Sequence, residues 1–129
     1  MKITTLILTA LASLTIASQA GELYSLGNTG AVITARKADL IKILALATTG
    51  QKGASFDLRE KAGIDLPQGT VVEVVSYFPG ENPRLRGSYY PGQKPGSPSK
   101  IAKIVWDNGT HTGYVYDFEL SRDRYVGSR

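Results

Sequence analysis

The spacing of hydrophobic positions changes near the middle of the chain. In residues 37–49 (KADLIKILALATT) apolar side chains recur at three- and four-residue intervals, which places Leu40, Leu44 and Ala47 on one stripe. That spacing predicts an amphipathic helix. Gly50 follows the last periodic residue, as a C-terminal helix glycine does.

A second, shorter helix is predicted over residues 55–62. Ser55 is a residue type that caps helix N-termini, and a glycine follows the last helical position. Phe56 and Leu58 are expected to be its buried side chains. The two helices would together form a helical segment of about 37–63.

After this segment the pattern becomes that of β-strands. Residues 70–78 (TVVEVVSYF) are largely apolar on both alternating faces, which predicts a central strand. Further strands are predicted at 31–35 (AVITA) and 101–106 (IAKIVW), with a turn-containing lead-in at 23–30. Residues 79–99 hold five of the six prolines and predict a long loop.

The stretch WDNGTHTGYVYDFEL contains the chain's one tryptophan and one histidine, Trp106 and His111. Asn108-Gly109 predicts a type I′ hairpin turn, because both central residues of that turn need positive φ. His111 then lies on the outgoing strand, while Trp106 and Tyr114 are expected to be largely buried.

A catalytic or metal-binding role for His111 would need partners that the sequence does not supply. There is no Gly-x-Ser-x-Gly elbow. There is also no second histidine, and no cysteine, to ligate a metal. We therefore predict no catalytic residue, no metal and no cofactor. A small hydrolase that combines carboxylates with His111 remains the less favoured alternative.

Two segments carry a resemblance to a known family. GIDLPQGTVVEVV (63–75) and IAKIVWDNGTHTGYVYDFEL (101–120) resemble the strand and hairpin motifs of bacterial SH3 domains. The resemblance implies a mainly β fold, a small five-stranded SH3-like barrel with 31–35 as its first strand. Here the helical segment 37–63 replaces the loop that usually follows that strand. Since that loop often helps form the family's peptide groove, the resemblance does not extend to cell-wall peptide binding.

The first twenty residues have the features of a cleaved signal peptide. Lys2 is followed by an apolar run that ends in Ser18-Gln19-Ala20, so we expect cleavage before Gly21 and a single domain over 21–129. The chain has no cysteine, which excludes disulfides and a lipid-bearing N-terminal cysteine. We expect a bacterial protein that is periplasmic or secreted and does not span the membrane.

Charge and aromatic content point to the long loop as a binding surface. Between Glu81 and Asp107 there are five basic residues and no acidic one, with two tyrosines among them. Cations supply attraction and tyrosines supply contact area, so the surface suits an anionic polymer or a protein partner. The alternative is a solvated loop whose charges serve solubility. The predicted binding residues are Arg84, Arg86, Tyr89, Tyr90, Lys94, Tyr116 and Phe118.

These features favour a non-catalytic exported module that binds a cell-envelope component or a protein partner. An inhibitor or immunity-type protein that blocks an envelope-acting enzyme belongs to the same group. Nucleic acid is not expected as a partner, because export separates the protein from cytoplasmic DNA and RNA. The formal net charge is also modest, since it is +4 for the full chain and +3 once Lys2 is removed. The sequence does not determine an oligomeric state.

Overall fold

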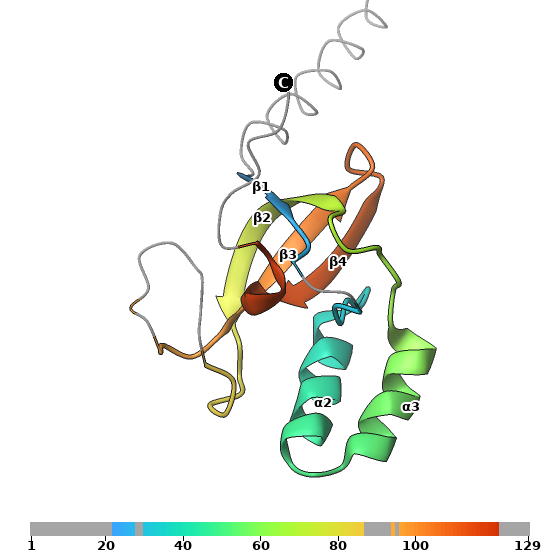
Figure 1. Ribbon diagram of the computed structural model, residues 1–129, viewed down its shortest axis with the longest axis vertical. Coiled ribbons are helices and arrows are strands. Elements are labelled where there is room, and N and C mark those ends of the chain that lie inside the picture. The colour runs from blue at the N-terminus through green and yellow to red at the C-terminus, as the bar shows by residue number, and fades with distance from the viewer. Residues whose placement is uncertain (1–21, 28–29, 87–93, 95, 122–129) are drawn as a thin grey trace, which may run out of the picture.

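The computed structural model describes residues 22–27, 30–86, 94 and 96–121. They form an antiparallel sheet of four strands, in the order β1-β2-β3-β4, with two helices beside it (Figure 1). The elements in chain order are β1 (Glu22–Ser25), α2 (Lys37–Thr48), α3 (Lys52–Ala62), β2 (Val71–Pro79), β3 (Lys100–Trp106), β4 (His111–Tyr116) and the short 3₁₀ turn η1 (Asp117–Glu119). The expected signal peptide, 1–20, lies outside the described residues.

Helix α2 confirms the helix predicted from the apolar stripe. It ends at Thr48, and Gly50 adopts a left-handed φ of 84°. The backbone N–H of Gln51 then donates to the carbonyl of Leu46 at 2.9 Å, which is the long hydrogen bond of a Schellman C-cap. This cap reverses the chain so that α3 returns alongside α2.

Helix α3 begins at Lys52, three residues before the predicted start, and two predictions about its residues are wrong. Ser55 is not an N-cap: it is buried, and its hydroxyl donates to the Ile43 carbonyl of α2 at 2.8 Å. Phe56 is 59% exposed rather than buried. The serine therefore joins two helices instead of starting one.

The first strand lies earlier in the chain than predicted. Residues 22–25, expected to be part of a turn-containing lead-in, form β1 and pair with β2. The predicted strand 31–35 makes only single bridges, from Thr34 to Gly63 and to Tyr114. Both helices lie between β1 and β2 and follow the segment 31–35 that was predicted as the first strand.

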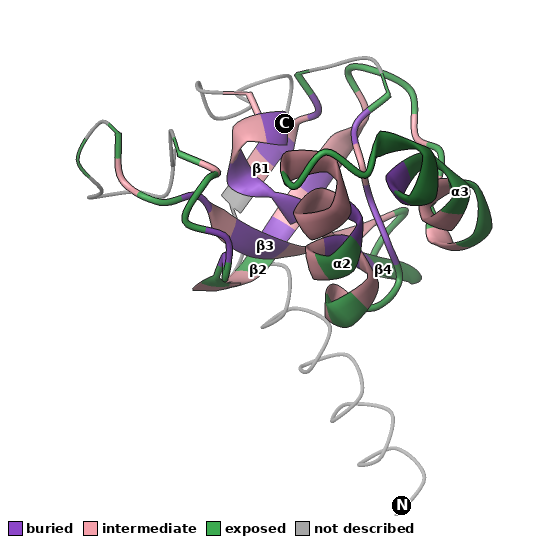
Figure 2. Ribbon diagram, turned by 90° about the horizontal axis from the view of Figure 1, so that it is seen from below, coloured by how far each residue is buried: buried purple, intermediate pink, exposed green. Residues whose placement is uncertain are grey.

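The sheet separates two groups of buried side chains, and most buried positions in Figure 2 lie on or near its strands. A β-bulge between Val74 and Ser76 shifts the alternation of β2, so that Tyr77 contacts the first group and Phe78 the second. The first group comprises Tyr24, Leu26, Ala31, Ile33, Val72, Val74, Ala102, Ile104, Val115 and Leu120. The second comprises Leu40 of α2 with Ile101 and Tyr116.

The sheet does not close into a barrel, so the predicted five-stranded SH3-like barrel is not found, while the coarser prediction of antiparallel β structure with helices holds. Beyond β1 the chain meets the end of η1 through a bridge between Leu26 and Leu120. The N–H of Ser121 also donates to the Ser25 carbonyl at 2.7 Å. Within the described residues, no helix has the length and apolar character needed to cross a membrane.

The positive φ values expected at Asn108 and Gly109 are present, at 58° and 79°, and Asp107 before them also has a positive φ, of 56°. The Thr110 N–H donates to the Asp107 carbonyl at 3.2 Å, and strand pairing stops one residue earlier, at Trp106 and His111. Trp106 and Tyr114 are partly rather than largely buried, so that prediction was too strong.

Candidate functional site

The described parts of the long loop are held together by hydrogen bonds. Pro79 at the end of β2 pairs with Lys100 at the start of β3, so the loop connects two neighbouring strands. Further out, the N–H of Ser99 donates to the Leu85 carbonyl at 2.9 Å. A bridge between Arg86 and Pro98 continues this contact. The two arms of the loop are therefore fixed relative to the sheet.

Arg84 is anchored to the C-terminus of α2. Its guanidinium Nη1 donates to the Thr48 carbonyl at 3.2 Å, where the helix dipole places partial negative charge. Its backbone N–H donates to the Asn82 side chain at 3.1 Å. Asn82 is buried and also donates through Nδ2 to the Thr48 hydroxyl at 3.2 Å. Helix α2 thus sets the position of this cation.

Arg86 and Lys94 lie on the outer part of the same loop, and both are exposed. The Arg86 Nη1 donates to the Gly96 carbonyl at 3.1 Å. Gly96 belongs to a turn in which the Ser97 N–H donates to the Lys94 carbonyl at 3.1 Å, and its φ of 84° suits glycine. Within the described residues, neither Arg84 nor Arg86 forms an ion pair with a carboxylate.

Of the four predicted aromatic residues, the two at the end of β4 and in η1 have different environments. Tyr116 is 1% exposed, and its hydroxyl donates to the Gly80 carbonyl at 2.7 Å. Burial, and secondarily the charge of Glu81, raises the pKa of Tyr116 to about 12. Phe118 stacks on the Tyr116 ring, with centroids 5.7 Å apart, and remains partly exposed. Tyr116 therefore supports the surface, while Phe118 is available to contact a ligand.

Leu85 and Phe118 pack on the same buried group of side chains. Leu85 lies between the two arginines in sequence, and the buried group contains Tyr116. We call the resulting feature the basic-aromatic surface and define it as Arg84, Arg86, Lys94 and Phe118. Tyr89 and Tyr90, also predicted, lie outside the described residues.

Sequence reasoning missed the residues that hold Arg84 in place. Asn82 precedes a proline, which is a sequence signal for a turn. Its second bond, to Thr48, joins residues 34 positions apart and has no local signal. The anchoring of this surface is therefore a tertiary property.

Within the described residues, the side-chain contacts of His111 are with Asp107 and Trp106. Its Nε2 lies 3.6 Å from Asp107, and its ring stacks on Trp106 with centroids 5.7 Å apart, at the exposed hairpin. The buried carboxylates Asp117 and Glu119 lie beyond the opposite end of β4, roughly 17 Å along the strand. Glu119 accepts the Val32 N–H at 3.1 Å. The described part of the chain has no group of three metal-ligating residues.

A scan of the sequence against protein-family models finds no match, and searches among curated proteins and solved structures find none either.

Proposed function

We propose that the protein is a non-catalytic, exported bacterial binding module that recognises an acidic polymer of the cell envelope. The observation that carries the proposal is the state of Arg84 and Arg86. Backbone carbonyls orient both guanidinium groups, and no carboxylate neutralises either one within the described residues. Such cations retain exposed N–H donors for carboxylate or phosphate oxygens.

Phe118, which packs on the same buried group as Leu85, adds an apolar face. A sugar ring of a glycan presents C–H groups that pack on an aromatic ring, while its acidic substituents reach the arginines. Because Phe118 is stacked on the buried Tyr116, it loses little side-chain entropy when a ligand binds. The surface thus combines charge with a pre-oriented aromatic contact.

An SH3-like arrangement is the finer fold proposal. The backbone contact of residues 25–27 with 119–121 supports it, because it brings the first and last segments of the sheet region together. In this proposal, α2 and α3 form an insertion between the first two strands. The insertion supplies the Thr48 carbonyl that orients Arg84.

The test is co-sedimentation of the purified protein with peptidoglycan sacculi and, in parallel, capture on lipopolysaccharide-coated beads. The Arg84→Gln/Arg86→Gln variant is expected to bind about 10-fold more weakly, since two exposed ion pairs contribute up to ~1 kcal/mol each. Raising the salt to 1 M should weaken the wild type similarly, because the screening length falls to roughly 3 Å.

The matched control is Lys42→Gln/Lys61→Gln, which removes the same charge from the exposed helices. This control should bind the polymer like the wild type. Equal losses in both variants would mean attraction by net charge alone and would refute the site. Binding that ignores both salt and the arginine substitutions would also refute it.

A further inference from the structure

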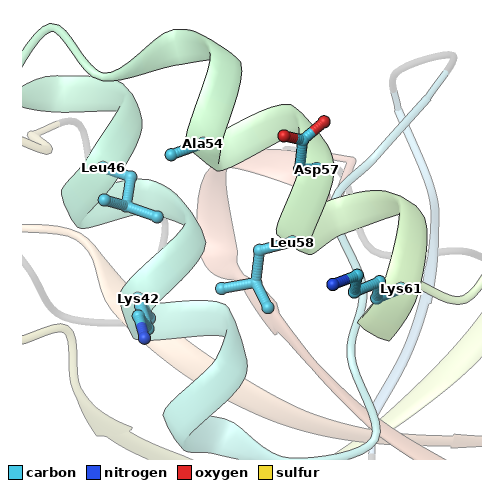
Figure 3. A pocket seen from close by; sticks show the side chains of 6 residues that line it. All are labelled: Lys42, Leu46, Ala54, Asp57, Leu58 and Lys61. Atoms are coloured by element: carbon cyan, nitrogen blue, oxygen red, sulfur yellow. The ribbon is translucent and has the colours of Figure 1, made fainter.

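A groove of about 320 Å³ lies between the two helices, outside the basic-aromatic surface. Figure 3 shows the groove in front of the strands, with α2 on one side and α3 on the other. Its lining residues are Lys42, Leu46, Ala54, Asp57, Leu58 and Lys61. The exposed Phe56 is not among them.

The groove is polarised along its length. Because the chain reverses at Gly50, Leu46 and Ala54 lie level with one another near the turn. Lys42 and Lys61 lie further from that turn, at the same end of the groove but on its opposite sides (Figure 3). One end is therefore apolar and the other is cationic.

The cationic end carries an excess of positive charge. The lining holds two lysines and one carboxylate, that of Asp57, and none of the three forms an ion pair within the described part of the chain. Between the two ends, Leu58 is only partly buried, as is Leu46. Apolar surface left in water beside an unneutralised positive charge complements a ligand that joins an alkyl chain to an anion.

We propose that this groove binds a free medium-chain fatty-acid anion. The carboxylate lies between Lys42 and Lys61, and the alkyl chain runs over Leu58 towards Leu46 and Ala54. The volume is at the small end of the range for ligand sites, roughly 300–1,000 Å³. Leu46 lies four positions after Lys42 in the helix, a rise of roughly 6 Å, which suits a medium rather than a long chain.

The test is an NMR titration of the ¹⁵N-labelled mature protein with sodium octanoate below its micelle concentration. Amide shifts should be saturable and centred on the facing sides of α2 and α3. Octanol and octylammonium carry the same tail with a different head, so they isolate the contribution of charge. We expect octanoate to bind about 10-fold more tightly than octanol, from two exposed ion pairs, and octylammonium to bind most weakly.

Chain length provides a second readout. Full burial of a methylene changes affinity about four-fold, and a chain with one side in water should gain about two-fold per methylene. Affinity should therefore rise about four-fold from hexanoate to octanoate and level off once the groove is filled. An equal affinity for these two acids would overturn the proposed path of the chain.

Three variants make the test specific. Lys42→Gln/Lys61→Gln should make octanoate bind no better than octanol, and unchanged octanol binding shows that the groove is intact. Asp57→Asn should strengthen octanoate binding two- to three-fold, since it removes a like charge. Arg84→Gln/Arg86→Gln should leave it unchanged. Equal binding of all three head groups to the wild type, shifts centred elsewhere, or no saturable shift would overturn the proposal.

Discussion

Replacing Tyr116 by phenylalanine removes a single buried hydroxyl and leaves the ring in place. In the wild type that hydroxyl donates to the Gly80 carbonyl at 2.7 Å, and both residues are buried. The substitution leaves the carbonyl without this donor, which costs about 1–3 kcal/mol. We therefore expect Tyr116→Phe to lower the free energy of unfolding at pH 7 by about 1.5 kcal/mol.

The same hydroxyl makes stability depend on alkaline pH. The pKa of Tyr116 rises from 10 to about 12 on folding, so below pH 10 the tyrosine is protonated in both states and its contribution is complete. Between pH 10 and 12 the unfolded chain ionises first, which favours unfolding. At pH 11 the wild type should have lost about 1.4 kcal/mol through this group, because one pKa unit corresponds to 1.36 kcal/mol.

The assay is urea unfolding at pH 7, 9 and 11, followed by far-ultraviolet circular dichroism so that tyrosinate does not affect the signal. The difference between wild type and Tyr116→Phe should be about 1.5 kcal/mol at pH 7 and close to zero at pH 11. Tyr114→Phe, on the same strand and partly exposed, is the control for loss of a tyrosine. A difference between wild type and Tyr116→Phe that stays constant from pH 7 to 11 would refute the reasoning.

Substitutions at two glycines and at the histidine give further predictions. The stability of each variant is measured by thermal or urea unfolding, and His111→Ala is also tested for polymer binding and fluorescence. Gly80→Ala should lower stability by more than 3 kcal/mol or prevent folding, because its Cβ would lie 1.9 Å from the Ser99 carbonyl oxygen. Gly53→Ala should raise stability by about 0.5–1 kcal/mol, since that Cβ meets nothing within 4 Å inside α3; destabilisation there would contradict the helix placement. His111→Ala should keep the fold and polymer binding and change mainly the Trp106 fluorescence, whereas loss of function without loss of stability would favour a catalytic role.

The sequence predicted the elements whose signal is local. Helix α2 follows from its apolar stripe and from the glycine after it, and strand β2 follows from a run that is largely apolar on both faces. Strand β1 was missed because four residues are too few for a periodic pattern, and it exists through pairing with β2 some fifty residues later. Conversely, the segment 31–35 has the composition of a strand, yet its backbone pairs with β4 only at Thr34.

The residues of the proposed binding site were predictable in composition, but their geometry was not. The run of basic residues without acids led to the prediction of Arg84 and Arg86 as binding residues. Nothing local indicated that Tyr116 would be buried while Phe118 stays partly exposed. Adjacent turn residues do not alternate as strand residues do, so their burial depends on which element packs above them.

The helical segment and the long loop, which the sequence presents as separate features, depend on each other in the structure. The last turn of α2 offers the Thr48 carbonyl to Arg84 and the Thr48 hydroxyl to Asn82. The Schellman cap uses the carbonyl of Leu46, so the carbonyl of Thr48 remains free for the loop. A domain in which a short loop replaced α2 would lack this anchor, and Arg84 would lose its fixed orientation. The helices therefore help to position the basic-aromatic surface as well as covering one end of the sheet.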